Sequence, residues 1–395
     1  MKSVELFVGA GGLAMGVSRA GFSPLAVVEW DNDACETIRE NQRRGVNPVR
    51  KWPLHHMDVR KFDYSNISQP VDLLAGGPPC QPFSLGGKHR GRHDERDMFP
   101  QVVRAVRELH PKAILIENVK GLTRQSFARY FEYIKLQITY PDILSRKNED
   151  WLDHLTRLER YHTKGKRDGL YYRVVTRLLN AADYGVPQRR ERVFFVGFRS
   201  DLGLEWSFPP ATHSLEALLW DQWVSGEYWD RHGVAKRNRP KLSPRLQARV
   251  TGLKNSAERP TEKPWLTVRE AISDLPRPDK GRRSSFSNHR FIPGARPYPG
   301  HTGSPMDEPA KTLKAGDHGV PGGENMLAHP DGRVRYFTVR ESARLQSFPD
   351  EYVFRGSWTE SMRQLGNAVP VKLGQAVAAN IGRLLHPAGK DASKN

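Results

Sequence analysis

The chain has 395 residues, of which 62 are Lys or Arg and 44 are Asp or Glu, so its formal net charge is +18. Hydrophobic residues make up 37% of the chain, which is enough to build the cores of two ordinary domains. A chain that is disordered along its whole length is therefore excluded. Its two cysteines cannot form a disulfide framework, and no apolar run approaches the roughly 20 residues that span a bilayer. We therefore expect a cytoplasmic protein without a membrane segment. The basic excess favours a polyanionic partner such as nucleic acid.

Strand-like and helix-like segments alternate over the first 120 residues. The expected strands are 4–8, 25–30, 71–75 and 113–119, and helical patterning is clearest at 33–41 and 98–109. Such alternation predicts βαβ units, and hence a doubly wound α/β fold with a parallel sheet covered on both faces. Binding groups should gather at the carboxyl ends of these strands, where Gly9, Glu29, Cys80 and Glu117 stand.

The rest of the chain divides by composition. Residues 121–170 are charged and aromatic, with helices expected around 124–138 and 150–161, and we interpret them as an insertion in the first domain. A strand pair at 171–179 and 192–198 follows, and a basic stretch lies at 236–249. We expect a first domain over 1–200, a smaller loop-rich domain with a positive face over 201–333, a patterned C-terminal segment over 334–386 and a flexible tail over 387–395.

A glycine-rich turn follows the first strand and opens a helix. Gly9, Gly11 and Ala14 occupy the three small positions of a loose dinucleotide-binding pattern, and Glu29 lies about 20 residues further on, where a carboxylate can accept hydrogen bonds from ribose hydroxyls. Nicotinamide enzymes and methyltransferases both use such a turn, and a purely structural turn is the alternative. Asp58 could accept a hydrogen bond from an adenine amino group, or it could be an ordinary loop aspartate.

Cys80 lies in the segment Gly-Gly-Pro-Pro-Cys-Gln-Pro-Phe-Ser, residues 76–84, directly after an apolar strand. Proline restricts its own φ and the residue before it, so this loop can hold an exposed nucleophile still. The alternative is a small buried cysteine, which is the common fate of a free thiol. We assign that structural role to Cys35, on an expected helix. No His, Cys or Asp cluster has metal-ligand spacing, so we expect no metal.

With these segments in order, the chain resembles the DNA cytosine-5 methyltransferases from end to end. The matching segments are the cofactor loop 5–12, the catalytic loop 78–81, Glu117-Asn118-Val119, the basic segment 188–192, residues 340–350 and the turn 366–370. Six matches in one order are very specific. Two departures are mild: Glu5 stands where the family often has Asp, and residues 121–170 are longer than in the shortest members.

The resemblance implies a covalent mechanism that uses S-adenosylmethionine. Cytosine C5 is a poor nucleophile, and attack of the Cys80 thiolate at C6 turns C5 into an enamine carbon. Glu117, kept protonated by burial, would donate to N3; of Arg190 and Arg192, which should point to the same face, one would contact the O2 edge and the other would brace the site. The cofactor-binding residues carried over from the family are Phe7, Gly9, Gly11, Gly12, Leu13, Glu29, Trp30, Asp58, Val59, Pro78, Asn367 and Val369.

The resemblance also implies duplex DNA as substrate, with the target base flipped out of the helix. Residues 81–98 suit a loop that closes over DNA, with Ser84, Lys88, Arg90 and Arg96 as its DNA contacts. Residues 201–333 become the target recognition domain, and 334–386 returns to the catalytic domain. We expect a monomer from a bacterial restriction–modification system, with a possible companion endonuclease.

Other functions remain open at this point. A catalytically silent DNA-binding regulator would not need Cys80, Glu117 and Arg190 together, and an RNA cytosine-5 methyltransferase is disfavoured by the long recognition region and the positive charge. A nicotinamide dehydrogenase fits only the glycine loop. Amino-group methyltransferases place an aromatic residue where Cys80 stands.

Overall fold

The computed structural model describes residues 1–79, 97–165, 169–256, 258–278, 284–299, 302–315 and 323–386. The chain forms two compact units that interleave along the sequence. Unit 1 comprises residues 1–179, 191–209 and the chain from 374 onward, and unit 2 comprises 180–190 and 210–373. The division of roles among the domains expected from the sequence stays a prediction. Among the described residues, no helix has the length and apolar character needed to cross a membrane.

Unit 1 is built on a seven-stranded sheet. Its strand order is β3-β2-β1-β4-β5-β7-β6. The strands are β1 (Lys2–Leu6), β2 (Ser23–Glu29), β3 (Leu54–His56), β4 (Leu73–Gly76), β5 (Ala113–Val119), β6 (Tyr172–Asn180) and β7 (Glu191–Arg199). Strand order turns back at β1, where β2 and β4 lie on either side, so the sheet is doubly wound as expected.

The sheet is mixed: the strands of the first 120 residues form the expected parallel part, and the strand pair that follows them adds an antiparallel neighbour. The five strands from β3 to β5 run parallel, whereas β7 pairs antiparallel with β5, from Ala113 opposite Phe198 to Val119 opposite Arg192. Seven consecutive residues of β7 are buried, so its sequence carries no alternation that could reveal its direction. The short β3 was not predicted, because three residues give no period.

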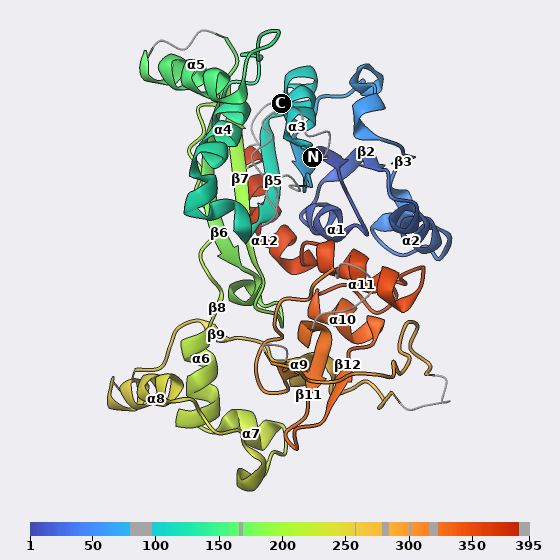
Figure 1. Cartoon of the computed structure of the whole chain (residues 1–395), viewed down its shortest axis with the longest axis vertical. Helices are drawn as coiled ribbons and strands as arrows, with labels where there is room; N and C mark the ends of the chain where they lie inside the picture. The colour runs from blue at the N-terminus through green and yellow to red at the C-terminus, as the bar shows by residue number, and fades with distance from the viewer. Residues whose placement is uncertain are drawn as a thin grey trace, which may run out of the picture. The chain divides into compact units, whose positions relative to one another are not determined.

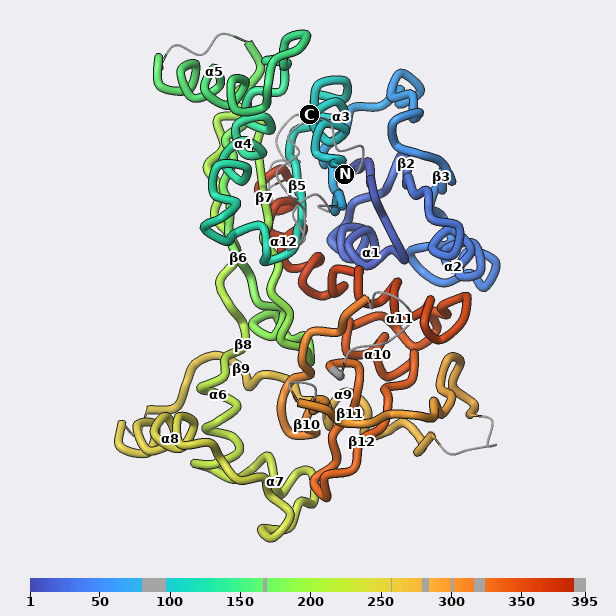
Figure 2. The backbone as a smooth tube through the Cα atoms, viewed as in Figure 1, coloured from blue at the N-terminus to red at the C-terminus, as the bar shows by residue number. Residues whose placement is uncertain are grey.

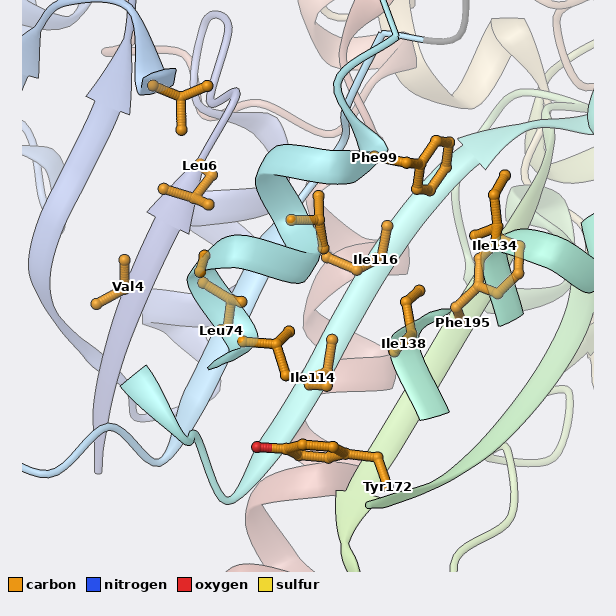
Figure 3. Close-up of a cluster of buried hydrophobic side chains, with 14 of the residues drawn as sticks. Val4, Leu6, Leu74, Phe99, Ile114, Ile116, Ile134, Ile138, Tyr172 and Phe195 are labelled. Atoms are coloured by element: carbon orange, nitrogen blue, oxygen red, sulfur yellow. The ribbon is translucent and has the colours of Figure 1, made fainter. Parts of the chain in front are cut away.

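Helices cover both faces of this sheet (Figure 1). They are α1 (Gly12–Arg19), α2 (Asn32–Arg43), α3 (Phe99–Leu109), α4 (Ala128–Thr139), α5 (Trp151–Thr163) and α12 (Val371–Leu385). Helices α3 and α4 lie in front of the sheet in Figures 1 and 3, and α12 lies behind it. A Cβ atom added at Gly374 of α12 would lie 3.1 Å from Leu13 Cδ1, so α12 packs closely on α1.

The main core fills the space between the sheet and helices α3 and α4 (Figure 3). Alternate residues of the strands point into it, and aromatic and branched side chains of the helices meet them. Its fully buried members include Val4, Leu6, Leu74, Ile114, Ile116, Phe99, Ile134, Ile138 and Phe195. This packing holds the strand ends, and the loops that leave them, in fixed positions.

Unit 2 is smaller and has short elements, as its Pro- and Gly-rich sequence predicts. Its helices are α6 (Leu215–Leu219), α7 (Glu227–Arg231), α8 (Pro244–Ser256), α9 (Val268–Ile272), α10 (Val339–Leu345) and α11 (Trp358–Asn367). Its strands are the pair β8 (His213–Ser214) and β9 (Lys263–Pro264), and a second sheet of β10 (Ser304–Pro305), β11 (Met326–Ala328) and β12 (Val334–Tyr336), shown in Figure 2. Leu218, Tyr228 and Trp229 form a separate buried cluster.

Candidate active site

The predicted cofactor loop leaves β1 through a run of left-handed backbone. Phe7 has φ 54°, Gly9 has φ 54° and Gly11 has φ 88°. Gly11 precedes the first residue of α1 and Gly12 and Leu13 begin that helix, so its N-terminal N–H groups face the end of the strand. A positive φ is natural for glycine but unusual for phenylalanine, and such strain is commonly found at functional sites.

Glu29 ties this loop to the end of β2. Its Oε2 accepts a hydrogen bond from the Gly9 N–H at 2.6 Å, and its Oε1 accepts from the N–H groups of Trp30 at 2.9 Å and Asp31 at 2.7 Å. Burial raises the pKa of the Glu29 carboxyl, and the three N–H groups oppose that shift. The adjacent Trp30 side chain is 71% exposed, so a large aromatic face stands beside a buried carboxylate.

Asp58 and Val59 follow β3, next to this edge. The Met57 N–H donates to the Glu29 carbonyl at 2.8 Å, which brings the two strand ends together. The Asp58 carboxylate accepts from the Arg60 N–H at 2.9 Å and from the Arg60 guanidinium at 2.6 Å, and these bonds lower its pKa. Val59 is buried. The structure thus brings the predicted residues of strands β1 to β3 to one edge of the sheet.

Glu117 and Arg192 form a buried ion pair at the same carboxyl edge. Arg192 Nε lies 2.8 Å from Glu117 Oε1, and the two side chains are only 10% and 9% exposed. Register explains the contact: Arg192 is opposite Val119, and Glu117 is two residues back along β5, on the same face. Burial lowers the pKa of Arg192 while the Glu117 carboxylate raises it.

The loop that leads to Cys80 lies against this pair. A Cβ atom at Gly77 would be 2.9 Å from Glu117 Oε2, so glycine is needed for the close approach. The Asn118 side-chain amide donates to the Pro78 carbonyl at 3.0 Å. On the far side of the loop, the Tyr130 hydroxyl donates to Asp97 at 2.6 Å. The chain is therefore anchored both before and after the segment that contains Cys80.

Sequence reasoning did not select Gly77, Asn118 or Asp97 as site residues. Asn118 is next to Glu117 in a segment that matches the family, and Gly77 is next to Pro78. Their position beside predicted site residues could therefore have identified them. Cys80, Ser84, Lys88, Arg90 and Arg96 lie outside the described residues. Cys35 is buried in α2, and burial raises the pKa of its thiol to about 12, which suits a structural cysteine.

The remaining predicted residues belong to unit 2. Arg190 is fully buried; its Nη1 donates to the Leu313 carbonyl at 2.9 Å and its Nη2 to the Gly366 carbonyl at 2.5 Å. Asn367 is the last residue of α11 and is exposed, and Val369, just after the helix, is buried. Arg190 and Arg192 thus have different partners in the structure: two backbone carbonyls for the first and a carboxylate for the second.

The chain matches one family of known proteins over most of its length. The family described as C-5 cytosine-specific DNA methylase matches residues 1–139 and 152–383. The type II methyltransferase M.Eco47II of Escherichia coli is 32% identical over 394 residues, covering 98% of this chain and 80% of that protein. The type II methyltransferase M.NgoMIV of Neisseria gonorrhoeae is 32% identical over 387 residues, covering 97% of each chain.

A solved structure shares the fold. The S. pombe Dnmt2 methyltransferase superposes with a TM-score of 0.53 at 16% identity, covering 98% of this chain and 99% of that one. At this identity the likeness concerns the fold alone. Since the family match covers nearly the whole chain and relatives above 30% identity span it, the chain belongs to the C-5 cytosine-specific DNA methylases and is a DNA (cytosine-5-)-methyltransferase.

Proposed function

We propose that this enzyme methylates one cytosine within a specific duplex sequence through a covalent bond from Cys80 to C6, with S-adenosylmethionine as methyl donor. The observation that carries the proposal is the buried Glu117–Arg192 pair, which lies against the chain leading to Cys80. A base held there would meet a thiol and a carboxyl group from adjacent strand ends. That is the pair of groups needed to activate a pyrimidine ring.

The residues at the ends of β1 and β2 fit S-adenosylmethionine. Glu29 Oε2 accepts one N–H, and a carboxylate oxygen has two lone pairs, so it can also accept from a ribose hydroxyl. The exposed Trp30 ring offers a surface on which adenine can stack. The N-terminal N–H groups of α1 can hold the polar end of the cofactor. When bound, S-adenosylmethionine supplies an electrophilic methyl group to C5.

Cys80 and Glu117 would act on opposite sides of the cytosine ring. Glu117 would first take up a proton from solvent. The Cys80 thiolate then donates an electron pair to C6, the C5–C6 π pair becomes available at C5, and Glu117 transfers its proton to N3 and becomes the carboxylate that pairs with Arg192. After methylation, a base removes the C5 proton, the C5–C6 double bond re-forms, and the C6–S bond breaks with its electron pair returning to sulfur. The N3 proton returns to Glu117, and the site is regenerated.

Arg192 would keep Glu117 in place through this cycle. The short contact to Oε1 fixes the rotation of the carboxyl group, so that Oε2 remains on the side of Gly77. Its positive charge also favours the electron-rich ring that exists while Cys80 is bound. Asn118 would set the distance of Cys80 from the base, because it holds the Pro78 carbonyl.

Covalent trapping tests the proposal directly. Duplex DNA of mixed sequence containing 5-fluorocytosine is incubated with S-adenosylmethionine and the wild-type protein or Cys80→Ala. A base cannot remove the fluorine at C5 in the way that it removes a proton, so the bond from Cys80 to C6 should persist. The wild type should therefore form an adduct that survives a denaturing gel, and Cys80→Ala should form none. Absence of an adduct on DNA with DNA binding retained would overturn the mechanism, and an adduct only on 5-fluorocytidine RNA would change the substrate.

We further propose that the enzyme is the modification partner in a type II restriction–modification system, which its relatives' names support. Sequencing the trapped site gives the recognised sequence. Plasmid DNA from cells that express the wild type should then resist a restriction endonuclease that cuts this sequence, while DNA from Cys80→Ala cells should be cut. Cutting in both cases would contradict the proposal.

A further inference from the structure

Unit 2 carries a strongly cationic segment around α8. Between residues 231 and 257 the chain has eight Lys or Arg residues and no Asp or Glu. Three of these cations are neutralised within the unit: Arg231 pairs with Asp221 at 2.7 Å, Arg239 with Asp230 at 3.9 Å, and Arg249 with Glu216. These ion pairs attach the segment to neighbouring elements of unit 2. They do not account for the positive charge of its other five cations.

The other five cations form what we call the α8 cationic set. Each has an exposed side chain, and none has a carboxylate within 4 Å among the described residues. They are Lys236, Arg237, Lys241, Arg245 and Lys254. Like charges held in one short segment repel each other, so such a set is unfavourable until an anion binds.

Helix α8 presents one face to the unit and the other to its surroundings. The helix begins at Pro244, after Ser243, whose hydroxyl accepts a hydrogen bond from the Leu246 N–H at 3.4 Å. Leu246, Val250 and Leu253 form its buried or half-buried stripe. Helix α6 lies beside α8 (Figure 1). Its exposed face includes the cationic or hydrogen-bonding side chains of Arg245, Gln247, Thr251, Lys254 and Asn255, and the small apolar residues Pro244 and Ala248.

Two positions of that exposed face carry little or no side chain. Gly252 lies in the helix interior, where glycine is unfavourable relative to alanine, yet a Cβ atom there would meet nothing within 4 Å. Within the part of the chain that the structure describes, no packing contact therefore requires this glycine. Ala248, one turn earlier, is also small and exposed. No internal contact explains this glycine, and cationic residues precede and follow it in the sequence. Because glycine has no side chain, an external group could approach the helix backbone closely at this position.

We propose that the α8 face binds the sugar–phosphate backbone of duplex DNA, with the α8 cationic set on the phosphates and the surface at Ala248 and Gly252 against the strand. This inference rests on DNA being the substrate. It adds a sequence-independent anchor that positions the enzyme without reading bases. An anionic membrane is disfavoured because the exposed face has no large apolar side chain to insert.

Salt dependence of binding tests the anchor. Each phosphate contact to B-DNA contributes about −0.9 to the slope of log K against log salt. The variant in which all five members of the α8 cationic set are changed to Gln should bind a fluorescent duplex of mixed sequence more weakly, with a slope less steep by about 2 to 4. The matched control changes five exposed cations of unit 1 to Gln: Lys51, Lys147, Lys164, Arg173 and Arg177. An equal change of slope in both variants, or none in the first, would overturn the proposal.

Gly252→Leu separates binding from folding. The added side chain has open space, so the thermal unfolding temperature should not fall, but DNA affinity should drop at least tenfold if the strand lies there. Unchanged affinity would show that the DNA strand does not lie against Gly252. Methyl transfer to plasmid DNA is measured alongside: a wild type that binds DNA with the expected slope but transfers no methyl group would contradict the proposed function and leave the anchor intact.

Discussion

Arg192 Nε lies 2.8 Å from Glu117 Oε1, across two adjacent antiparallel strands of one sheet. The antiparallel pairing is what brings the start of β7 to the end of β5. In a parallel arrangement, the residue at the start of one strand would lie beside the start of its neighbour, and this pair could not form. The one reversed strand in contact with β5 therefore supplies the cation that holds the proposed acid in place.

Removing either partner of this pair should have distinct effects. Glu117→Gln should lower kcat by about 10²- to 10⁴-fold, the range for loss of a general acid. Arg192→Gln should lower kcat as well and also reduce the free energy of unfolding by about 3–5 kcal/mol, because it leaves a buried carboxylate without its cation. The double variant should be more stable than Arg192→Gln alone. Urea unfolding and methyl transfer measure these effects, and equal stability of Arg192→Gln and wild type would contradict the assignment.

Gly77→Ala should impair catalysis without unfolding the protein. Its methyl group would stand 2.9 Å from Glu117 Oε2, so the carboxyl group or the loop must shift. We expect a fall in kcat of about 10²-fold, since a displacement of about 1 Å can have that effect. Gly121→Ala is the matched control, because a Cβ atom there makes only an ordinary 3.8 Å contact with Val119. Similar kcat values for the two variants would show that the approach at Gly77 is not needed.

Arg190 should act mainly through stability, in contrast to Arg192. Its guanidinium donates to the carbonyls of Leu313 and Gly366, and Arg190→Met would leave both without this donor, at a cost of about 1–3 kcal/mol for each buried group. The neighbouring Arg189 forms an exposed ion pair with Glu308, worth about 0–1 kcal/mol, so Arg189→Met should change little. Unfolding curves test the difference. If Arg190→Met instead lost much of its kcat while remaining as stable as the wild type, Arg190 would take part in the reaction itself.

Glu5 should make stability depend on pH. Burial raises the pKa of this carboxyl to about 7, above the ordinary 4.5 that it would have in the unfolded chain. Between these two values the folded protein holds a proton that the unfolded chain has lost, so the contribution of Glu5 to stability is present at low pH and is lost as pH rises through 7. Glu5→Gln should remove this dependence.

The comparison of wild type with Glu5→Gln isolates this residue from other titrating groups. Their difference in free energy of unfolding, measured in urea at pH 5 and pH 8, should shift in favour of the variant by about 3 kcal/mol at the higher pH, since one pKa unit corresponds to about 1.4 kcal/mol. An equal difference at both pH values would mean that Glu5 titrates normally in the folded protein.

Much of unit 1 could be predicted from the sequence because its elements are long and periodic. The strands at Ser23–Glu29 and Ala113–Val119 and the helix Val371–Leu385 lie where hydrophobic patterns indicate them. The direction of β7 could not be predicted, since a strand buried on both faces has no telling pattern. The contact between Gly77 and Glu117 could not be predicted either. It requires the ends of β4 and β5 to lie side by side, and this depends on the order of strands in the sheet.

The packing of Gly374 against Leu13 has a consequence for biosynthesis. These two residues are roughly 360 positions apart, so the contact between them is among the most non-local in the fold. A ribosome releases the chain from its N-terminus onward, at about 5–20 residues per second, and α12 therefore arrives tens of seconds after the sheet's first strand. Until then one side of α1 has no cover. The glycine turn at the start of α1 is synthesised early, but its helix gains the packing of α12 late. A newly made chain should therefore complete the proposed methyl-donor site only after α12 has been translated.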